Sequence, residues 1–193
     1  MQLLIATTNP GKKKEFTSLL QDIPLDLKFP DVLGIQMEVE ETGSTYRENA
    51  LLKAETLCRL SGMMTMADDT GLEVAALEGR PGLHSARYAR EKVNTDAGRR
   101  EHLLTELEKS PRPWTARFVC VVALARPGQE TLTFDGYVAG EIIPEERGEY
   151  GFGYDRIFYI PSLGKTMAEF NLDEKNLYSH RAIAVNQAKE YLT

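Results

Sequence analysis

The sequence of 193 residues predicts an α/β fold built on a mixed β-sheet flanked by helices. Apolar, strand-like runs alternate along the chain with segments of helical periodicity, which is typical of this class. Two apolar segments, 115–125 and 130–143, follow one another closely and are predicted to pair as antiparallel strands, so a mixed sheet is expected. No repeat or linker-like tract interrupts the chain, and residues 1–193 are therefore predicted to form a single domain.

The first part of the chain predicts a strand, two helices and a second strand, in that order. Residues 2–7 form a short apolar run typical of a buried strand, and a turn sequence follows. Apolar residues at i, i+3, i+4 and i+7 over 16–23 predict a helix. The capping-box pattern S/T-x-x-E at 45–48 begins a second helix. Residues 63–67 predict a strand that ends at the Asp-Asp-Thr-Gly sequence of 68–71.

The second part of the chain continues the alternation around the two long strands. A loop rich in glycine and proline is expected at 79–85, and apolar spacing over 95–109 predicts a helix. A glycine-rich loop at 148–153 precedes a short strand at 157–160. The last helix is predicted to begin near Ser179.

Composition excludes several classes of protein. The 23 Lys and Arg against 29 Asp and Glu leave a net charge of −6, which argues against a broadly basic surface for nucleic acid. No apolar run approaches the ~20 residues of a membrane span, and the N-terminus lacks the charged start of a signal peptide. Cys58 and Cys120 lie in apolar surroundings without zinc-ligand spacing, so buried reduced thiols are expected. We therefore expect a cytoplasmic protein that binds neither membrane nor nucleic acid.

The turn after the first strand is a candidate site for a polyphosphate. A strand-to-helix turn with hydroxyls, glycine and lysine presents backbone N–H groups and the positive end of a helix dipole to an anion. It lacks the GxxxxGK[ST] spacing of a P-loop, and an ordinary polar turn is the alternative. The segment consists of Thr7, Thr8, Asn9, Pro10, Gly11 and Lys12.

Carboxylates gather at two places in the sequence. Asp68 and Asp69 directly follow an apolar run, where their oxygens suit Mg²⁺ and one of them could act as a general base toward water. Turn or helix-cap residues are the alternative. Glu38, Glu40 and Glu41 by themselves indicate a solvated loop, and they gain a role only if one of them folds back toward Asp69 to share a metal.

Two later segments could recognise a purine base and its phosphates. Residues 151–155 place an aromatic ring between glycines, where it can stack on a base, although a β-turn with one core aromatic fits as well. Donors at the start of the last helix suit a phosphate or a base carbonyl, and a capped helix with solvated charges is the alternative. These donors are Lys175, Ser179, His180 and Arg181.

Taken together and in order, five segments resemble the inosine triphosphate pyrophosphatase family, enzymes that hydrolyse non-standard purine nucleoside triphosphates such as ITP, dITP and XTP. The segments are TTNPGK, VEETGSTYRENA, ADDTGLEV with RPGLHSARYA, GFGYD and EKxxxSHRxxA, and the resemblance runs from residue 2 to about 188. It implies an elongated α/β fold with two lobes around a long mixed sheet, a central active-site cleft, and a homodimer.

The resemblance also implies roles for single residues. Residues 7–12 would bind the triphosphate. Glu40 and Asp69 would hold Mg²⁺, and Glu41 is the neighbouring alternative to Glu40. Asp69 would accept a proton from the attacking water, and Asp68 would support it. The remaining predicted substrate contacts are Thr70, Phe152 stacked on the base, Gly153, Tyr154, Asp155, Lys175, Ser179, His180 and Arg181.

Two residues depart from the family pattern beside the base loop, and two other functions remain as alternatives. Tyr150 stands where the family often has glycine and Arg156 where it usually has proline, so the loop that would bind the base departs from the pattern. A pyrophosphatase of another modified nucleoside triphosphate would share the metal and phosphate residues and differ at 150–156. A non-catalytic nucleotide sensor on the same fold would bind ITP without releasing pyrophosphate.

Overall fold

The computed structural model describes residues 1–35, 39–89 and 94–192. The strands are β1 (Gln2–Ile5), β2 (Asp26–Lys28), β3 (Thr65–Val74), β4 (Pro81–Gly82), β5 (Trp114–Ala125), β6 (Leu132–Ile142), β7 (Phe158–Ile160) and β8 (Lys165–Thr166). The helices are α1 (Pro10–Leu19), α2 (Tyr46–Ser61), α3 (Asp96–Leu107), α4 (Leu172–Tyr178) and α5 (His180–Lys189). Short 3₁₀ turns lie at Ala75–Leu77, Ser85–Arg87 and Met167–Glu169.

Within these described ranges the strands form one eight-stranded sheet, and the predicted mixed α/β class is confirmed. Hydrogen-bonded neighbours follow the order β2-β1-β3-β5-β6-β7-β8, and β4 pairs with β3. β1 is parallel to both β2 and β3, whereas β4, β7 and β8 join their neighbours antiparallel. Contacts divide the chain into two compact units, and β3, β5 and β6 each have residues in both. The predicted lobes, cleft and single domain stay predictions.

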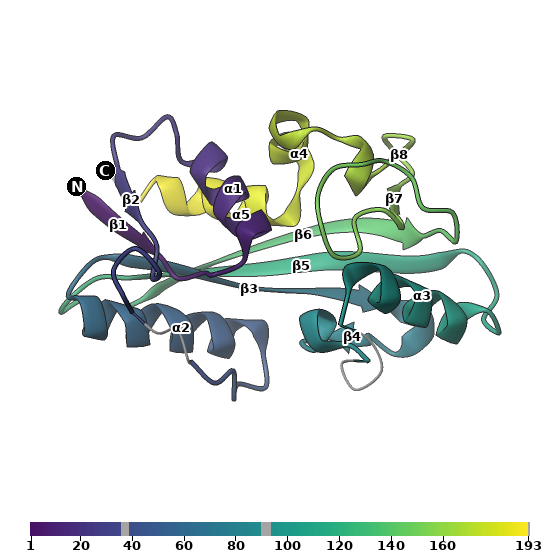
Figure 1. Cartoon of the computed structure of the whole chain (residues 1–193), viewed down its shortest axis with the longest axis horizontal. Coiled ribbons are helices and arrows are strands. Elements are labelled where there is room, and N and C mark those ends of the chain that lie inside the picture. The colour runs from purple at the N-terminus through teal and green to yellow at the C-terminus, as the bar shows by residue number, and fades with distance from the viewer. Residues whose placement is uncertain (36–38, 90–93, 193) are drawn as a thin grey trace. The chain divides into compact units, whose positions relative to one another are not determined.

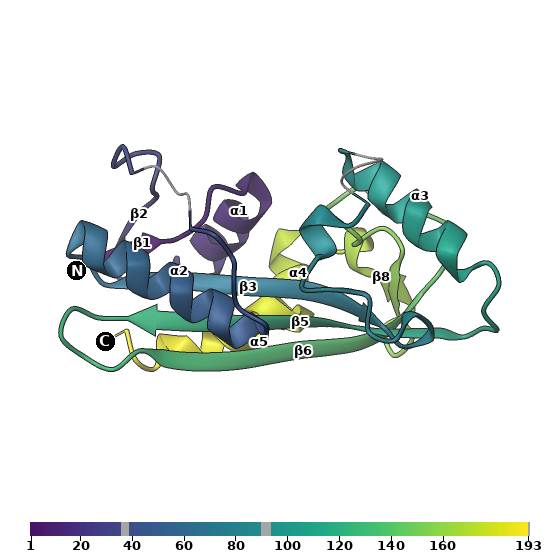
Figure 2. The same cartoon turned by 90° about the horizontal axis from the view of Figure 1, so that it is seen from below.

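The first unit comprises Met1–Asp69, Cys120–Gly136 and Arg181–Thr193. Its part of the sheet is covered on both faces, by α1 and α5 on one side and by α2 on the other (Figures 1 and 2). Side chains follow the alternation of a strand, since Leu3 and Ile5 pack with α1 and α5 while Leu4 packs with α2. Burial on both faces explains why these strands are continuous apolar runs in the sequence.

The second unit comprises Thr70–Val119 and Tyr137–His180. Its core joins the ends of the long strands to α3 and to the segment around β7. Leu103 and Leu107 of α3 are fully buried in this core, as the apolar spacing predicts, together with Phe158. In the described part of the chain, no helix is both long and apolar enough to cross a bilayer.

One element differs from the sequence prediction in a way that bears on the site. β3 does not end before the acidic pair: it continues to Val74, so Asp68 and Asp69 lie in its middle. The turn-like composition of this segment was misleading because both carboxylates are buried and paired with cations, which lets the strand continue. The short elements β2, β4, β8 and α4 were also not predicted.

Replacing Gly148 by alanine should destabilise the protein more than replacing Gly128. Both glycines have positive φ, 83° and 72°, so both variants carry the same backbone penalty. A Cβ at Gly148 would lie 2.1 Å from the carbonyl oxygen of Ala168, whereas a Cβ at Gly128 meets nothing within 4 Å. The extra loss should be about 1–3 kcal/mol in urea denaturation. Equal losses in the two variants would contradict the close packing of Gly148.

Candidate active site

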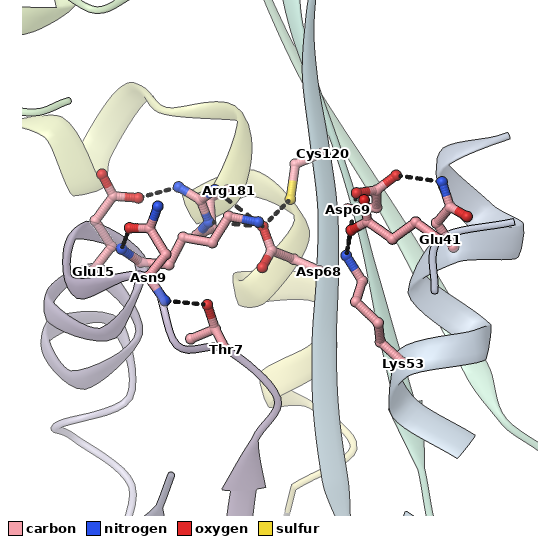
Figure 3. Close-up of polar contacts among 11 residues, drawn as sticks. Thr7, Asn9, Glu15, Glu41, Lys53, Asp68, Asp69, Cys120 and Arg181 are labelled. Atoms are coloured by element: carbon pink, nitrogen blue, oxygen red, sulfur yellow. Dashed lines mark hydrogen bonds and ion pairs between the residues drawn. The ribbon is translucent and has the colours of Figure 1, made fainter. Parts of the chain in front are cut away.

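The two adjacent aspartates of β3 point to opposite faces of the strand (Figure 3). Asp68 faces α1 and Arg181, and Asp69 faces α2. Both are buried, with exposed fractions of 2% and 6%. Each carboxylate therefore has its own set of ion-pair partners, and the supporting role of Asp68 that the resemblance implies stays a prediction.

Asp68 is held in a group of charges, the Asp68 network, which consists of Lys12, Glu15, Asp68 and Arg181. The ammonium of Lys12 lies 2.9 Å from Asp68 Oδ2, and the Arg181 guanidinium donates to the same oxygen at 3.0 and 3.2 Å. Arg181 also pairs with Glu15. Burial by itself would raise the pKa of Asp68, but Lys12 and Arg181 hold it well below its usual range. The charged form of this carboxylate is therefore favoured, and two cations lie beside it.

The predicted phosphate turn lies directly beside this network. Asn9 caps α1 by accepting a hydrogen bond from the backbone N–H of Lys12 at 3.1 Å, and Pro10 occupies the first turn. Thr7 is buried and its hydroxyl accepts from the N–H of Asn9, whereas Thr8 is exposed. The turn thus connects β1 to a capped helix, and Lys12, in the first turn of that helix, brings its ammonium to the same place.

On the other face, Asp69 belongs to a second group, the Asp69 cluster, which consists of Glu41, Asn49, Lys53 and Asp69. Lys53 donates to Asp69 Oδ1 at 3.2 Å and to Glu41 Oε1 at 2.8 Å, and the Asn49 amide donates to Asp69 Oδ2 at 3.2 Å. Burial raises the pKa of Asp69; the Lys53 ammonium opposes this shift and the Glu41 carboxylate reinforces it. Asp69 is therefore a stronger proton acceptor than an exposed aspartate.

The acidic loop that precedes α2 contributes one glutamate to this cluster. Glu41 is half-buried and shares the Lys53 ammonium with Asp69, whereas Glu40 is exposed. Glu38 lies outside the described residues. The contacts thus favour Glu41 over Glu40 as the carboxylate next to Asp69, and the role of Glu40 stays a prediction.

The second unit holds the residues predicted to contact the base, gathered around the glycine-rich base loop, residues 148–155. The Asp155 carboxylate accepts from the N–H of Phe152 at 2.9 Å and from the Lys175 ammonium at 2.6 Å. That ammonium lies 5.1 Å from the centroid of the Phe152 ring. Asp155 and Lys175 are buried, while Phe152 and Gly153 are half-buried. The structure therefore joins the GFGYD segment to α4 as one cluster.

The other predicted residues have contacts of a different kind. Tyr154 is buried in the core and donates to the carbonyl of Ser85 at 3.1 Å. His180 stacks on Phe118 with ring centroids 4.7 Å apart, and Ser179 is buried at the end of α4. Thr70 is half-buried, so its side chain keeps partial access to solvent.

Sequence analysis missed Asn49 and Lys53. These residues are spaced i, i+4 on α2, next to the apolar positions Ala50 and Ala54, and both are buried. A lysine and an asparagine beside the apolar stripe of an otherwise amphipathic helix are the signal that could have identified them, because such groups are buried only with a partner.

The Asp69 cluster fits a divalent cation by the chemistry of its donors. Two carboxylates share the Lys53 ammonium, so the oxygens of this site already surround one cation. Hard oxygen donors of this kind are the ligands Mg²⁺ prefers. Over the residues that the structure describes, no group of three or more Asp, Glu, His or Cys side chains is arranged to hold a metal, so water or substrate oxygens would complete the shell.

Comparison with known proteins gives consistent matches over nearly the whole chain. A model of the Ham1 family matches residues 3–191. The dITP/XTP pyrophosphatase of Bacillus subtilis is 48% identical, covering 99% of this chain and 96% of the relative, and that of Geobacter sulfurreducens is 43% identical, covering 99% and 96%. The solved structure of the Staphylococcus aureus Ham1 protein is similar with a TM-score of 0.87 at 42% identity, covering 100% and 98%. The solved structure of a HAM1 protein from Coxiella burnetii is similar with a TM-score of 0.89 at 39% identity, again covering 100% of this chain and 98% of the other.

Replacing Arg181 by methionine should destabilise the protein by about 3–5 kcal/mol, because it leaves the buried carboxylates of Asp68 and Glu15 without their shared cation. Arg117→Met is the matched control, since Arg117 pairs with Glu73 at the surface and its loss should cost about 1 kcal/mol or less. Urea denaturation measures both. Similar losses would show that the Asp68 network does not depend on Arg181.

Proposed function

The chain belongs to the Ham1 family, and on this basis we propose that it hydrolyses non-standard purine nucleoside triphosphates, dITP, ITP and XTP, to the monophosphate and pyrophosphate. Such an activity keeps deaminated purines out of DNA and RNA. The observation that carries the proposal is the Asp69 cluster, in which a buried carboxylate of raised pKa shares a lysine with a second carboxylate.

In the proposed reaction, Asp69 accepts a proton from a water molecule that attacks the α-phosphorus. A bond forms between the water oxygen and the phosphorus, the bond to the bridging oxygen breaks, and pyrophosphate leaves. A carboxylate whose pKa is raised by burial removes that proton more readily than an exposed one. Phosphoryl transfer needs positioning and neutralisation of charge above all, and Lys12 and Lys53 supply cations for this purpose.

We propose that Mg²⁺ binds to Asp69 and Glu41, with Glu40 as the ligand that the resemblance implies. When bound, the ion would neutralise phosphate charge and orient the triphosphate chain. Support comes from the two carboxylates of the Asp69 cluster, which would otherwise repel a polyanionic substrate. Lys53, which holds both carboxylates in the structure, is then available to the phosphates.

For the base, we propose that the Phe152 ring stacks on the purine and that Asp155, Lys175 and His180 lie around it. Hypoxanthine and xanthine present a keto acceptor at position 6, whereas adenine presents an amino group that leaves buried donors unpaired. In a dry pocket such a mismatch can discriminate by ~10⁴-fold. Thr70, Ser179 and residues 7–12 would complete the substrate contacts.

Further properties belong to the same proposal. We propose a cytoplasmic homodimer that acts on free nucleotides and not on nucleic acid. The net charge of −6 supports the proposal that nucleic acid is not a substrate. A negatively charged protein repels a long polyanion whose phosphates are not each neutralised by a metal ion.

Pyrophosphate release should be rapid with dITP, ITP and XTP, slow with ATP and the pyrimidine triphosphates, and lost without Mg²⁺. Asp69→Asn should abolish turnover while ITP binding, measured by calorimetry, is largely kept, because the amide retains an acceptor for Lys53 but cannot take a proton. Binding of ITP without pyrophosphate release in the wild type would favour a sensor. A fast pyrimidine substrate would favour another pyrophosphatase, and turnover by the Asp69 variant near the wild-type rate would refute its role.

Phe152→Ala should raise KM for ITP by about tenfold or more, in line with the loss of one base–aromatic stack, and should change kcat less. Tyr150→Ala is the matched control: Tyr150 is an aromatic residue of the same loop, but its side chain is 56% exposed. Steady-state kinetics distinguish the two variants. A KM that is unchanged in Phe152→Ala, or raised equally in both, would remove the stacking role.

A further inference from the structure

Helix α3 carries two side chains that hold the base loop at a single residue. Asp96 Oδ2 accepts a hydrogen bond from the N–H of Gly153 at 2.8 Å. Arg100 Nη1 donates to the carbonyl oxygen of the same glycine at 2.8 Å. Both polar groups of Gly153 are therefore bound to one helix, one turn apart, and the backbone immediately after Phe152 is attached on both sides.

Arg100 is itself fixed by a carboxylate, which makes it a rigid donor. It is 6% exposed, and its Nε and Nη2 donate to the two oxygens of Glu146 at 2.7 and 3.1 Å. Arg156 lies 3.5 Å from the same carboxylate, and its carbonyl accepts from the N–H of Arg147 at 2.9 Å. Arg156, at a position where the family usually has proline, thus completes the group that orients Arg100.

The loop is also attached on the side of α4. The N–H of Phe152 is bound by Asp155, which is in turn held by Lys175. Two successive amides, those of residues 152 and 153, therefore have separate carboxylate acceptors on different elements. A backbone held in this way keeps a half-buried ring in one place before any ligand arrives, which reduces the entropy that binding would cost.

We infer that Asp96 and Arg100 are positioning residues, which place the Phe152 ring for the purine by holding the peptide groups of Gly153. The inference rests on the proposed function, since it assigns the helix a part in recognising the base. It predicts that the affinity for the base-containing substrate depends on α3, although neither side chain contacts the base.

The test compares Asp96→Ala, Arg100→Met and Asp96→Asn with Glu101→Ala, a control on the exposed side of α3. Asp96→Ala and Arg100→Met should raise KM for dITP by about tenfold. Their kcat should stay within about twofold of the wild-type value, and inhibition by inorganic pyrophosphate should be unchanged. Asp96→Asn should restore most of the affinity, because its amide oxygen still accepts from Gly153. Hydrogen exchange should become faster within residues 148–155 and stay unchanged elsewhere in the described chain.

Three outcomes would overturn the inference. The first is an unchanged KM for dITP in both Asp96→Ala and Arg100→Met. The second is a joint change of kcat, KM and pyrophosphate inhibition, as a general loss of folding would cause. The third is an Asp96→Asn variant as impaired as Asp96→Ala. If the wild type releases no pyrophosphate from any triphosphate, the proposed function fails. Hydrogen exchange then tests the attachment of the loop independently of activity. Equal protection of the amides of residues 148–155 in the wild type and in Asp96→Ala would refute that attachment.

Discussion

Two adjacent carboxylates in the interior of one buried strand are the constraint on which the rest of this structure depends. Because successive side chains of a strand point to opposite faces, Asp68 and Asp69 form their ion pairs with different cations, and each face supplies its own. Lys12 and Arg181 do so on one face and Lys53 on the other. The helices that cover this part of the sheet are therefore bound to it by charge as well as by apolar packing.

The groups of charges on the two faces of β3 differ in their ionic partners, and this difference bears on their roles. The Asp68 network pairs two carboxylates with two cations and holds the corner that begins α1. In the Asp69 cluster two carboxylates share the Lys53 ammonium, and one of them, Asp69, has a raised pKa. A carboxylate beside two cations favours its charged form, whereas a carboxylate of raised pKa takes up a proton more readily.

The base loop shows how a flexible sequence becomes a fixed binding surface. Glycines at 151 and 153 adopt positive φ, and the backbone between them is held by carboxylates and by Arg100. Glycine permits this path, but side chains from α3 and α4 select it. The departure at Arg156 fits the same picture, since it adds a charge to the group that holds Arg100.

The sequence by itself determined the α/β class, the long strands β5 and β6, the helices α1, α2, α3 and α5, and the segments from which the proposed site is drawn. It could do so because apolar periodicity, capping residues and glycine spacing are local properties of the chain. Only the tertiary structure decided that β3 runs through the acidic pair, that Glu41 shares the Lys53 ammonium with Asp69, and that Arg100 holds the base loop. Those features depend on which charges meet across elements far apart in the chain, and a buried carboxylate is tolerated in a strand only where such a partner arrives.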